Sequence, residues 1–174
     1  NLLVGISIIL LISLCASSLS IFLLSKSIHD DAKMINNTGI VRGSIQRITK
    51  LELSPSIENN IKCQEQIKST DNLINSLANF KWARVGLYNV SFVKLSNSWV
   101  TMKSLLASHN QNPTPENAQA VMEQSELIWI ESNAAVNNAQ LESERKVSYF
   151  NRLFAVFLVN IILIAIFILA FAAV

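Results

Sequence analysis

Ionisable side chains are confined to the middle of this chain. All 14 Lys and Arg residues and all 12 Asp and Glu residues lie between Lys26 and Arg152, so residues 1–25 and 153–174 carry none of them. Both ends consist mainly of aliphatic residues and Phe, and each reaches the ~20 residues with which an apolar helix crosses a bilayer. The sequence therefore predicts a transmembrane helix at 1–25, a polar domain at 26–152 and a second transmembrane helix at 153–174.

A secretory signal peptide is the alternative interpretation of residues 1–25. Its apolar part is only ~7–15 residues long and ends at a small-residue cleavage site, whereas this run is longer and continues into a segment that is compatible with a helix. Two spans place both termini on one side, and we expect the central domain to lie outside the inner or plasma membrane. Because the chain lacks a first Met and stops abruptly at Val174, we expect it to be part of a longer protein with a cytoplasmic output module.

Charge and cysteine content argue against several classes of function. A net charge of +2 lacks the basic footprint of a nucleic-acid-binding domain. Cys15 lies in the first predicted span and Cys63 stands alone in the central domain, which excludes a disulfide within that domain. His29 and His109 have no companions at metal-ligand spacing, and no nucleophile-and-base pair is present. We therefore expect no metal, no cofactor, no nucleic-acid partner and no catalytic site in this segment.

Proline and glycine divide the central segment into helical blocks. The first block continues from the span to about Leu53, and the Ser-Pro pair at 54–55 provides a cap and a first-turn proline for the second, which runs to about Trp82. Gly86 is the expected turn before the third block. The sequence HNQNPTP at 109–115 is the clearest loop.

The fourth block starts with a cap threonine, a first-turn proline and an acid at 114–116, and no residue beyond them breaks a helix. It is therefore expected to continue into the second span. Four amphipathic helices joined by short turns predict an all-α fold, namely an antiparallel four-helix bundle flanked by the two spans. Each helix has one apolar stripe, so a second copy of the chain, in a parallel homodimer, is the expected completion of the core.

Apolar residues at helical spacing identify the expected core. In the second block these are Ile57, Ile61, Ile67, Ile74 and Leu77. In the third block they are Phe92, Leu95, Trp99, Met102 and Leu106, and in the fourth Ala120, Leu127, Ala134 and Leu141 recur every seven residues. We interpret Trp82, Trp99 and Trp129 as core or groove residues, with an organic-ligand pocket as the alternative. Asn160, inside the second span, is expected to bond to a dimer mate or to a backbone carbonyl.

The first block also carries a stripe, and its residues have the spacing of a coiled-coil seam. Its members are Ile28, Ala32, Ile35, Gly39, Arg42, Gln46, Thr49 and Leu53. Glycine inside a helix costs ~1 kcal/mol relative to alanine, so Gly39 and Gly43 indicate a positional purpose. If two first helices meet along the seam, the two Arg42 side chains repel each other, and a small anion between them would be held by charge-assisted hydrogen bonds. The alternative is that Arg42 points outward and pairs with a carboxylate such as Glu52.

The run at 36–47, NNTGIVRGSIQR, resembles the first periplasmic helix of the nitrate/nitrite sensor histidine kinases and of the related type IV pilus chemoreceptor N-terminal domain. Gly39, Arg42 and Arg47 match this pattern, and Gln46 and Lys50 match the pilus-type variant. The sequence departs from the pattern at position 43, where the family usually has a larger apolar residue, and at position 45, where the pilus-type variant has Ser.

The resemblance implies a dimeric sensor bundle whose paired first helices bind a small anion such as nitrate. Arg42 is then the residue that holds the ligand, and Thr38, Gly39, Gly43 and Gln46 complete the candidate ligand-binding set. The expected partners are this anion, a second copy of the chain and membrane lipid.

The resulting hypothesis is a transmembrane signal-transduction receptor. Ligand binding would shift the first helix relative to the fourth by ~1–2 Å, and the spans would relay the shift to an output module such as a histidine kinase or a diguanylate cyclase. One alternative is a chemoreceptor-type sensor that binds a small organic ligand in a pocket among the helices. Another is a membrane protein that binds a protein partner and transmits no signal.

Overall fold

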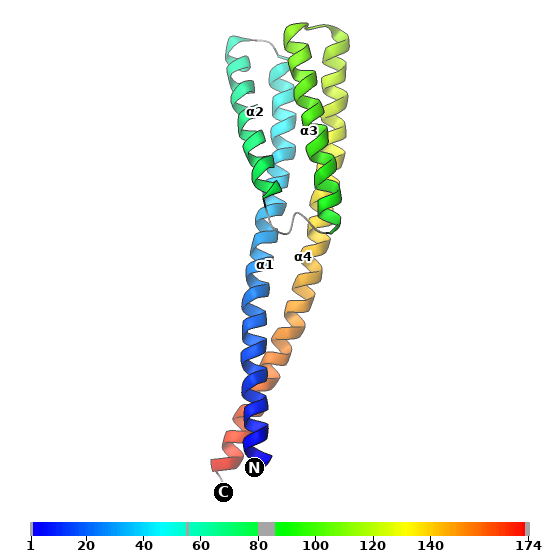
Figure 1. The fold of residues 1–174 in the computed structure, drawn as a ribbon. Helices are drawn as coiled ribbons and strands as arrows, with labels where there is room; N and C mark the ends of the chain where they lie inside the picture. Colours follow the sequence, from blue (N-terminus) through cyan, green and yellow to red (C-terminus); the bar gives the residue numbers. More distant parts are fainter. Residues whose placement is uncertain (1, 55, 80–85, 173–174) are drawn as a thin grey trace. The chain divides into compact units, whose positions relative to one another are not determined.

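The computed structural model describes residues 2–54, 56–79 and 86–172, which form four helices (Figure 1). α1 spans Leu2–Glu52, α2 spans Ile57–Ala78, α3 spans Leu87–Gln111 and α4 spans Pro115–Ala172. These described residues contain no strand. The prediction of an all-α chain, in which two long helices enclose two shorter ones, is confirmed.

Side chains cap α2 and α4 at or close to the predicted positions. Ser56, rather than Ser54, is the N-cap of α2, and its side chain accepts a hydrogen bond from the Asn59 backbone at 3.0 Å. Thr114 caps α4 as predicted, by accepting a hydrogen bond from the Asn117 backbone at 3.3 Å. The predicted loop at 109–115 is shorter than expected, because α3 continues to Gln111 and no residue before position 113 prevents a helical turn.

Gly86 forms the turn before α3, as predicted. Its φ of 95° belongs to the left-handed region, which only glycine adopts readily. The next residue, Leu87, donates its backbone N–H to a carboxylate oxygen of Glu142 at 2.6 Å. This contact ties the beginning of α3 to α4 and gives one of the orphan N–H groups of the first turn a partner.

Packing divides the chain into two units. The polar unit comprises Ala32–Glu142, and the apolar unit comprises Asn1–Asp31 with Ser143–Val174. Neither α1 nor α4 is interrupted where the units meet in sequence. The predicted domain bounds at 26–152 follow the distribution of charge rather than packing, and they stay a prediction.

All four helices contribute to one core in the polar unit. α3 supplies the largest share, because its predicted stripe is buried in full, from Phe92 to Leu106. α1 supplies the buried side chains Met34, Val41, Ile45 and Ile48. α2 and α4 supply Cys63, Ile74, Leu77, Val121, Ile128, Ala135 and Ala139.

The predicted core stripe of α2 is partly wrong, and that of α4 is wrong, because none of its four members is buried. Ile57 and Ile61 are 85% and 58% exposed, and only the later part of the α2 stripe is buried. In α4, Leu127 is 44% exposed whereas its neighbour Ile128 is fully buried. The buried stripe of α4 includes Ser125 and Ser132, which a search for apolar residues does not find.

The apolar unit contains two helical stretches that are long and apolar enough to cross a membrane, with only 6% of each apolar window buried. This is compatible with a two-span membrane protein. Within the unit, Lys146 forms an ion pair with the buried carboxylate of Asp31 at 2.7 Å. The Asn160 side chain donates to the Ser13 hydroxyl at 2.9 Å, so it has a side-chain partner within the same chain, and the predicted bond to a dimer mate stays a prediction.

The adjacent residues Leu127 and Ile128 provide a test of the α4 core. Ile128→Ala removes fully buried methyl groups and should lower the free energy of unfolding by about 2–5 kcal/mol. Leu127→Ala should change it by less than about 1 kcal/mol, because that side chain keeps much of its exposure. Chemical denaturation of the full chain in a mild detergent, followed by circular dichroism, measures both values. Equal effects would show that the buried stripe of α4 is misassigned.

Candidate functional site

Arg42 reaches from α1 to α4 within the polar unit. Its Nη1 atom donates a hydrogen bond to Asn133 Oδ1 at 2.5 Å, and its guanidinium carbon lies 4.7 Å from the centre of the Trp129 ring. The side chain is partly buried. Among the described residues Arg42 forms no ion pair, and the Glu52 carboxylate, its alternative predicted partner, pairs with His109 instead. The cation is therefore held by a neutral amide and an aromatic face.

The two other polar residues of the predicted site, Gln46 and Thr38, lie in different surroundings. Gln46 lies near Arg42 on the side of α1 that faces α4, and its side-chain amide donates to the Ser125 hydroxyl at 3.1 Å. Thr38 is fully buried; its hydroxyl donates to the Met34 carbonyl at 2.9 Å and lies 3.1 Å from the Tyr88 hydroxyl. Thr38 thus belongs to the core, where it has no exposed surface with which to contact a ligand.

Gly39 and Gly43 face open space. A Cβ atom added at either position would meet no heavy atom within 4 Å. Within the described chain, therefore, no close approach between helices requires these two glycines. They leave a flat, uncrowded strip on α1.

The described tryptophans have different roles. Trp129 is 39% exposed and carries the Arg42 guanidinium on its face. Trp99 is buried, and its indole N–H donates to an Asp71 carboxylate oxygen at 2.8 Å. Lys103 bonds to the same oxygen. Although burial acts to raise it, the pKa of Asp71 is lowered by its hydrogen bonds from Lys103 and Trp99. Trp82 lies outside the described residues.

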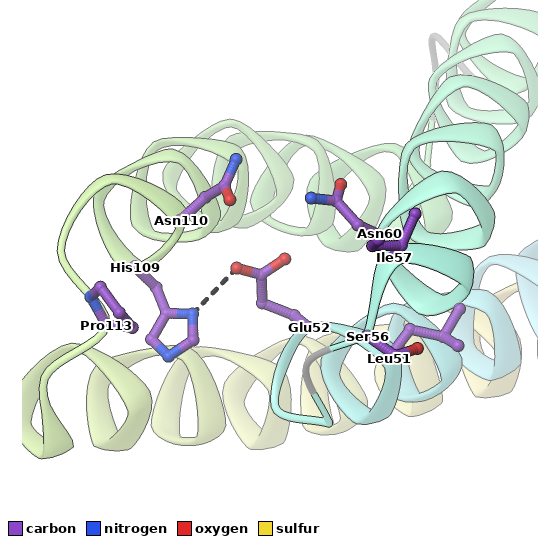
Figure 2. A pocket seen from close by; sticks show the side chains of 8 residues that line it. All are labelled: Leu51, Glu52, Ser56, Ile57, Asn60, His109, Asn110 and Pro113. Atoms are coloured by element: carbon purple, nitrogen blue, oxygen red, sulfur yellow. Dashed lines mark hydrogen bonds and ion pairs between the residues drawn. The ribbon is translucent and has the colours of Figure 1, made fainter.

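A second polar cluster, which the sequence reasoning missed, lies where the α1–α2 and α3–α4 connections meet. Glu52, the last residue of α1, pairs through Oε1 with His109 Nδ1 at 2.8 Å (Figure 2). Its other oxygen accepts a hydrogen bond from the Cys63 thiol at 3.6 Å. The Glu52 and His109 side chains are only 11% and 12% exposed. Because 57 positions separate them in sequence, spacing could not have found the pair.

The Glu52–His109 pair lines a cavity of about 400 Å³, which we call the tip pocket. Its eight lining residues are Leu51, Glu52, Ser56, Ile57, Asn60, His109, Asn110 and Pro113 (Figure 2). One wall is apolar, and the side chains of Asn60 and Asn110 line the same cavity as the Glu52 carboxylate. Concave sites of this size and mixed polarity are typical of small-molecule binding.

The surroundings of Cys63 keep its thiol protonated. Burial, together with the nearby negative charge of Glu52, raises the pKa of the Cys63 thiol to about 12. A thiol needs its thiolate form to act as a nucleophile or a metal ligand. Among the described residues no group of three His, Cys, Asp or Glu side chains could hold a metal ion.

No known protein family, curated protein or solved structure matches the chain. The resemblance to the nitrate/nitrite sensor kinases consequently stays a prediction that depends on the residues of α1.

The Cys63 thiol predicts how stability changes with pH. Its pKa rises from an ordinary 9.0 to about 12 on folding, so between these values the folded chain binds more protons than the unfolded chain. The free energy of unfolding should therefore fall, by about 1.4 kcal/mol per pH unit, as the pH rises through this range. Denaturation of the full chain in detergent at several alkaline pH values measures the slope.

Cys63→Ser is the control, because a serine hydroxyl does not ionise in this range. The pKa of Tyr88 is also raised by burial, and the comparison with the variant subtracts its contribution. Identical slopes for the two chains would contradict the assignment.

Proposed function

We propose that this chain is the sensing segment of a transmembrane receptor, which binds a small anion at Arg42 and relays binding through its two apolar helices. In this proposal residues 26–152 form an extracytoplasmic four-helix bundle, two copies associate in parallel through α1, and a cytoplasmic output module follows. The observation that carries the proposal is the partly buried Arg42 guanidinium, which forms no ion pair with any described residue.

The chemistry of Arg42 favours an anionic ligand. Taking a charged group out of water is costly unless an opposite charge or good hydrogen bonds compensate it. Asn133 occupies one of the five N–H donors of the guanidinium, and the remaining donors can bind a planar oxyanion in a fork-like arrangement. Nitrate is such an anion, and it fits the family that the α1 sequence resembles.

The exposed face of α1 supports association with a second copy. Gly39 and Gly43 leave it uncrowded, and Ile40 between them is 48% exposed. A flat strip that carries an apolar side chain permits another helix to approach closely. Such an approach would explain why the helix tolerates two interior glycines, each of which costs ~1 kcal/mol relative to alanine.

The contacts between α1 and α4 suggest how binding could be relayed. An anion on the remaining donors of Arg42 would lie beside the Arg42–Asn133 hydrogen bond, and the Gln46–Ser125 hydrogen bond is on the same pair of helices. Both helices run without interruption from the polar unit into their apolar segments. A ligand that prefers one arrangement of α1 against α4 shifts the population of the two states by its differential affinity, typically ~1–3 kcal/mol.

Nitrate titration of Arg42 variants tests this proposal. The full chain is reconstituted in lipid nanodiscs, and thermal unfolding is followed with nitrate or with chloride at equal ionic strength. Nitrate at about 100 times its dissociation constant should stabilise the wild type by about 2.7 kcal/mol, and Arg42→Ala should abolish this effect. Arg47→Ala, which removes an exposed arginine of the same helix, is the matched control and should respond as the wild type does.

Two results would contradict the proposal. One is equal stabilisation of Arg42→Ala and the wild type by nitrate, which would place the anion elsewhere. The other is a monomeric chain in nanodiscs, whatever the nitrate concentration, since the proposed receptor is a homodimer.

A further inference from the structure

We propose that the tip pocket is a second binding site, which takes a small organic compound with a primary ammonium group and uses Glu52 as its counter-ion. This inference does not depend on anion binding at Arg42. It is carried by the charge of the pocket, by the arrangement of its polar groups and by its apolar wall.

The charge of the tip pocket favours a cation. Among its eight lining residues Glu52 is the only acid, and there is no Lys or Arg. His109 Nδ1 lies 2.8 Å from Glu52 Oε1, within hydrogen-bond distance of the carboxylate. The thiol of Cys63, on the other carboxylate oxygen, stays protonated because its pKa is raised to about 12. Apart from His109, no side chain of the pocket lining could neutralise this carboxylate.

The polar groups around Glu52 match the donors of an ammonium group. A primary ammonium has three N–H donors, which need three acceptors. The amides of Asn60 and Asn110 lie on either side of the space above the Glu52 carboxylate (Figure 2). Neither of these side-chain amides has a hydrogen-bond partner among the described residues, so their oxygens are free to accept. With each amide turned so that its oxygen faces the cavity, one carboxylate oxygen and two amide oxygens supply the three acceptors.

The remaining wall suits the hydrocarbon part of such a ligand. Leu51, Ile57 and Pro113 line the same cavity. Ile57, the first residue of α2, is 85% exposed. It does not pack into the core of the polar unit. A ligand of a few carbon atoms would cover this side chain and gain the free energy of removing apolar surface from water.

A smaller hollow of about 200 Å³ extends the site. It shares Glu52 and Asn110 with the tip pocket, and Lys103 is part of its lining. The Lys103 ammonium, which is held by Asp71 at 2.8 Å, offers a positive charge to a ligand carboxylate. The ammonium compound could thus be a simple amine or an amino acid, and matched ligands separate the two.

Calorimetric titration of the full chain in nanodiscs tests the site with three probes of similar carbon skeleton. Isopentylamine carries only the ammonium, leucine carries an ammonium and a carboxylate, and 4-methylpentanoate carries only the carboxylate. Isopentylamine should bind, and Glu52→Gln should weaken it at least about tenfold by removing the charge-assisted bond. Leucine binding more tightly than isopentylamine would identify an amino-acid site, and weaker binding a simple-amine site. 4-Methylpentanoate should not bind.

Matched variants separate loss of the site from loss of the fold. Glu65→Gln changes an exposed carboxylate of α2 and should leave isopentylamine affinity unchanged. Asn60→Leu removes one proposed acceptor from an exposed position and should weaken binding severalfold, whereas Asn75→Leu, also exposed on α2, should not. The proposal is overturned if isopentylamine fails to bind the wild type, binds Glu52→Gln and Asn60→Leu as tightly as the wild type, or binds no better than 4-methylpentanoate.

Discussion

The polar contacts between α1 and α4 are the constraint on which the rest of this structure depends. In the polar unit these helices are joined by Arg42–Asn133 and Gln46–Ser125, and in the apolar unit by Asp31–Lys146 and Ser13–Asn160. A typical hydrogen bond contributes only ~0.5–1.5 kcal/mol net, whereas deleting a large apolar side chain from a core costs ~2–5 kcal/mol. A neutral pair such as Gln46–Ser125 therefore costs less to exchange for another partner than a buried apolar side chain costs to remove. In the polar unit α1 and α4 therefore combine a shared apolar core with polar contacts that a ligand at Arg42 would alter.

The contacts of α3 in the polar unit are mainly aromatic and buried, unlike the polar contacts between α1 and α4. α3 brings Tyr88, Phe92 and Trp99 into the core, and the Tyr88 and Phe92 rings stack with their centres 5.7 Å apart. Trp99 and Lys103 are fixed to α2 through Asp71, while the Gln124 amide donates to the Ser98 carbonyl of α3 at 2.9 Å. Large buried rings with satisfied polar atoms resist displacement. α3 thus supplies a stable centre, against which the more polar contacts of α1 and α4 can change without loss of the fold.

Sequence patterns predicted the helices better than the contacts between them. The α3 stripe from Phe92 to Leu106 was identified correctly, because every member is large and apolar. The α4 stripe was not, since a seven-residue repeat describes several parallel faces of a helix and the buried one contains Ser125 and Ser132. The importance of Arg42 could be inferred from its own helix, but its partners Asn133 and Trp129 lie on α4. The Glu52–His109 pair could be identified only from the folded structure, because no local sequence pattern around either residue indicates the other as its partner.

Both proposed sites place their charged group on α1. Arg42 and Glu52 are ten positions apart on one continuous helix, a separation of about 15 Å at 1.5 Å per residue. A ligand that favours one position of α1 at either site alters the population of that position for the other site as well. Linkage requires the effect to be reciprocal, so an ammonium compound that raises nitrate affinity by some factor has its own affinity raised by nitrate by the same factor. If α1 moves as a single element, the two sites cannot be energetically independent, and the sign of their coupling reports whether both ligands favour the same arrangement of α1.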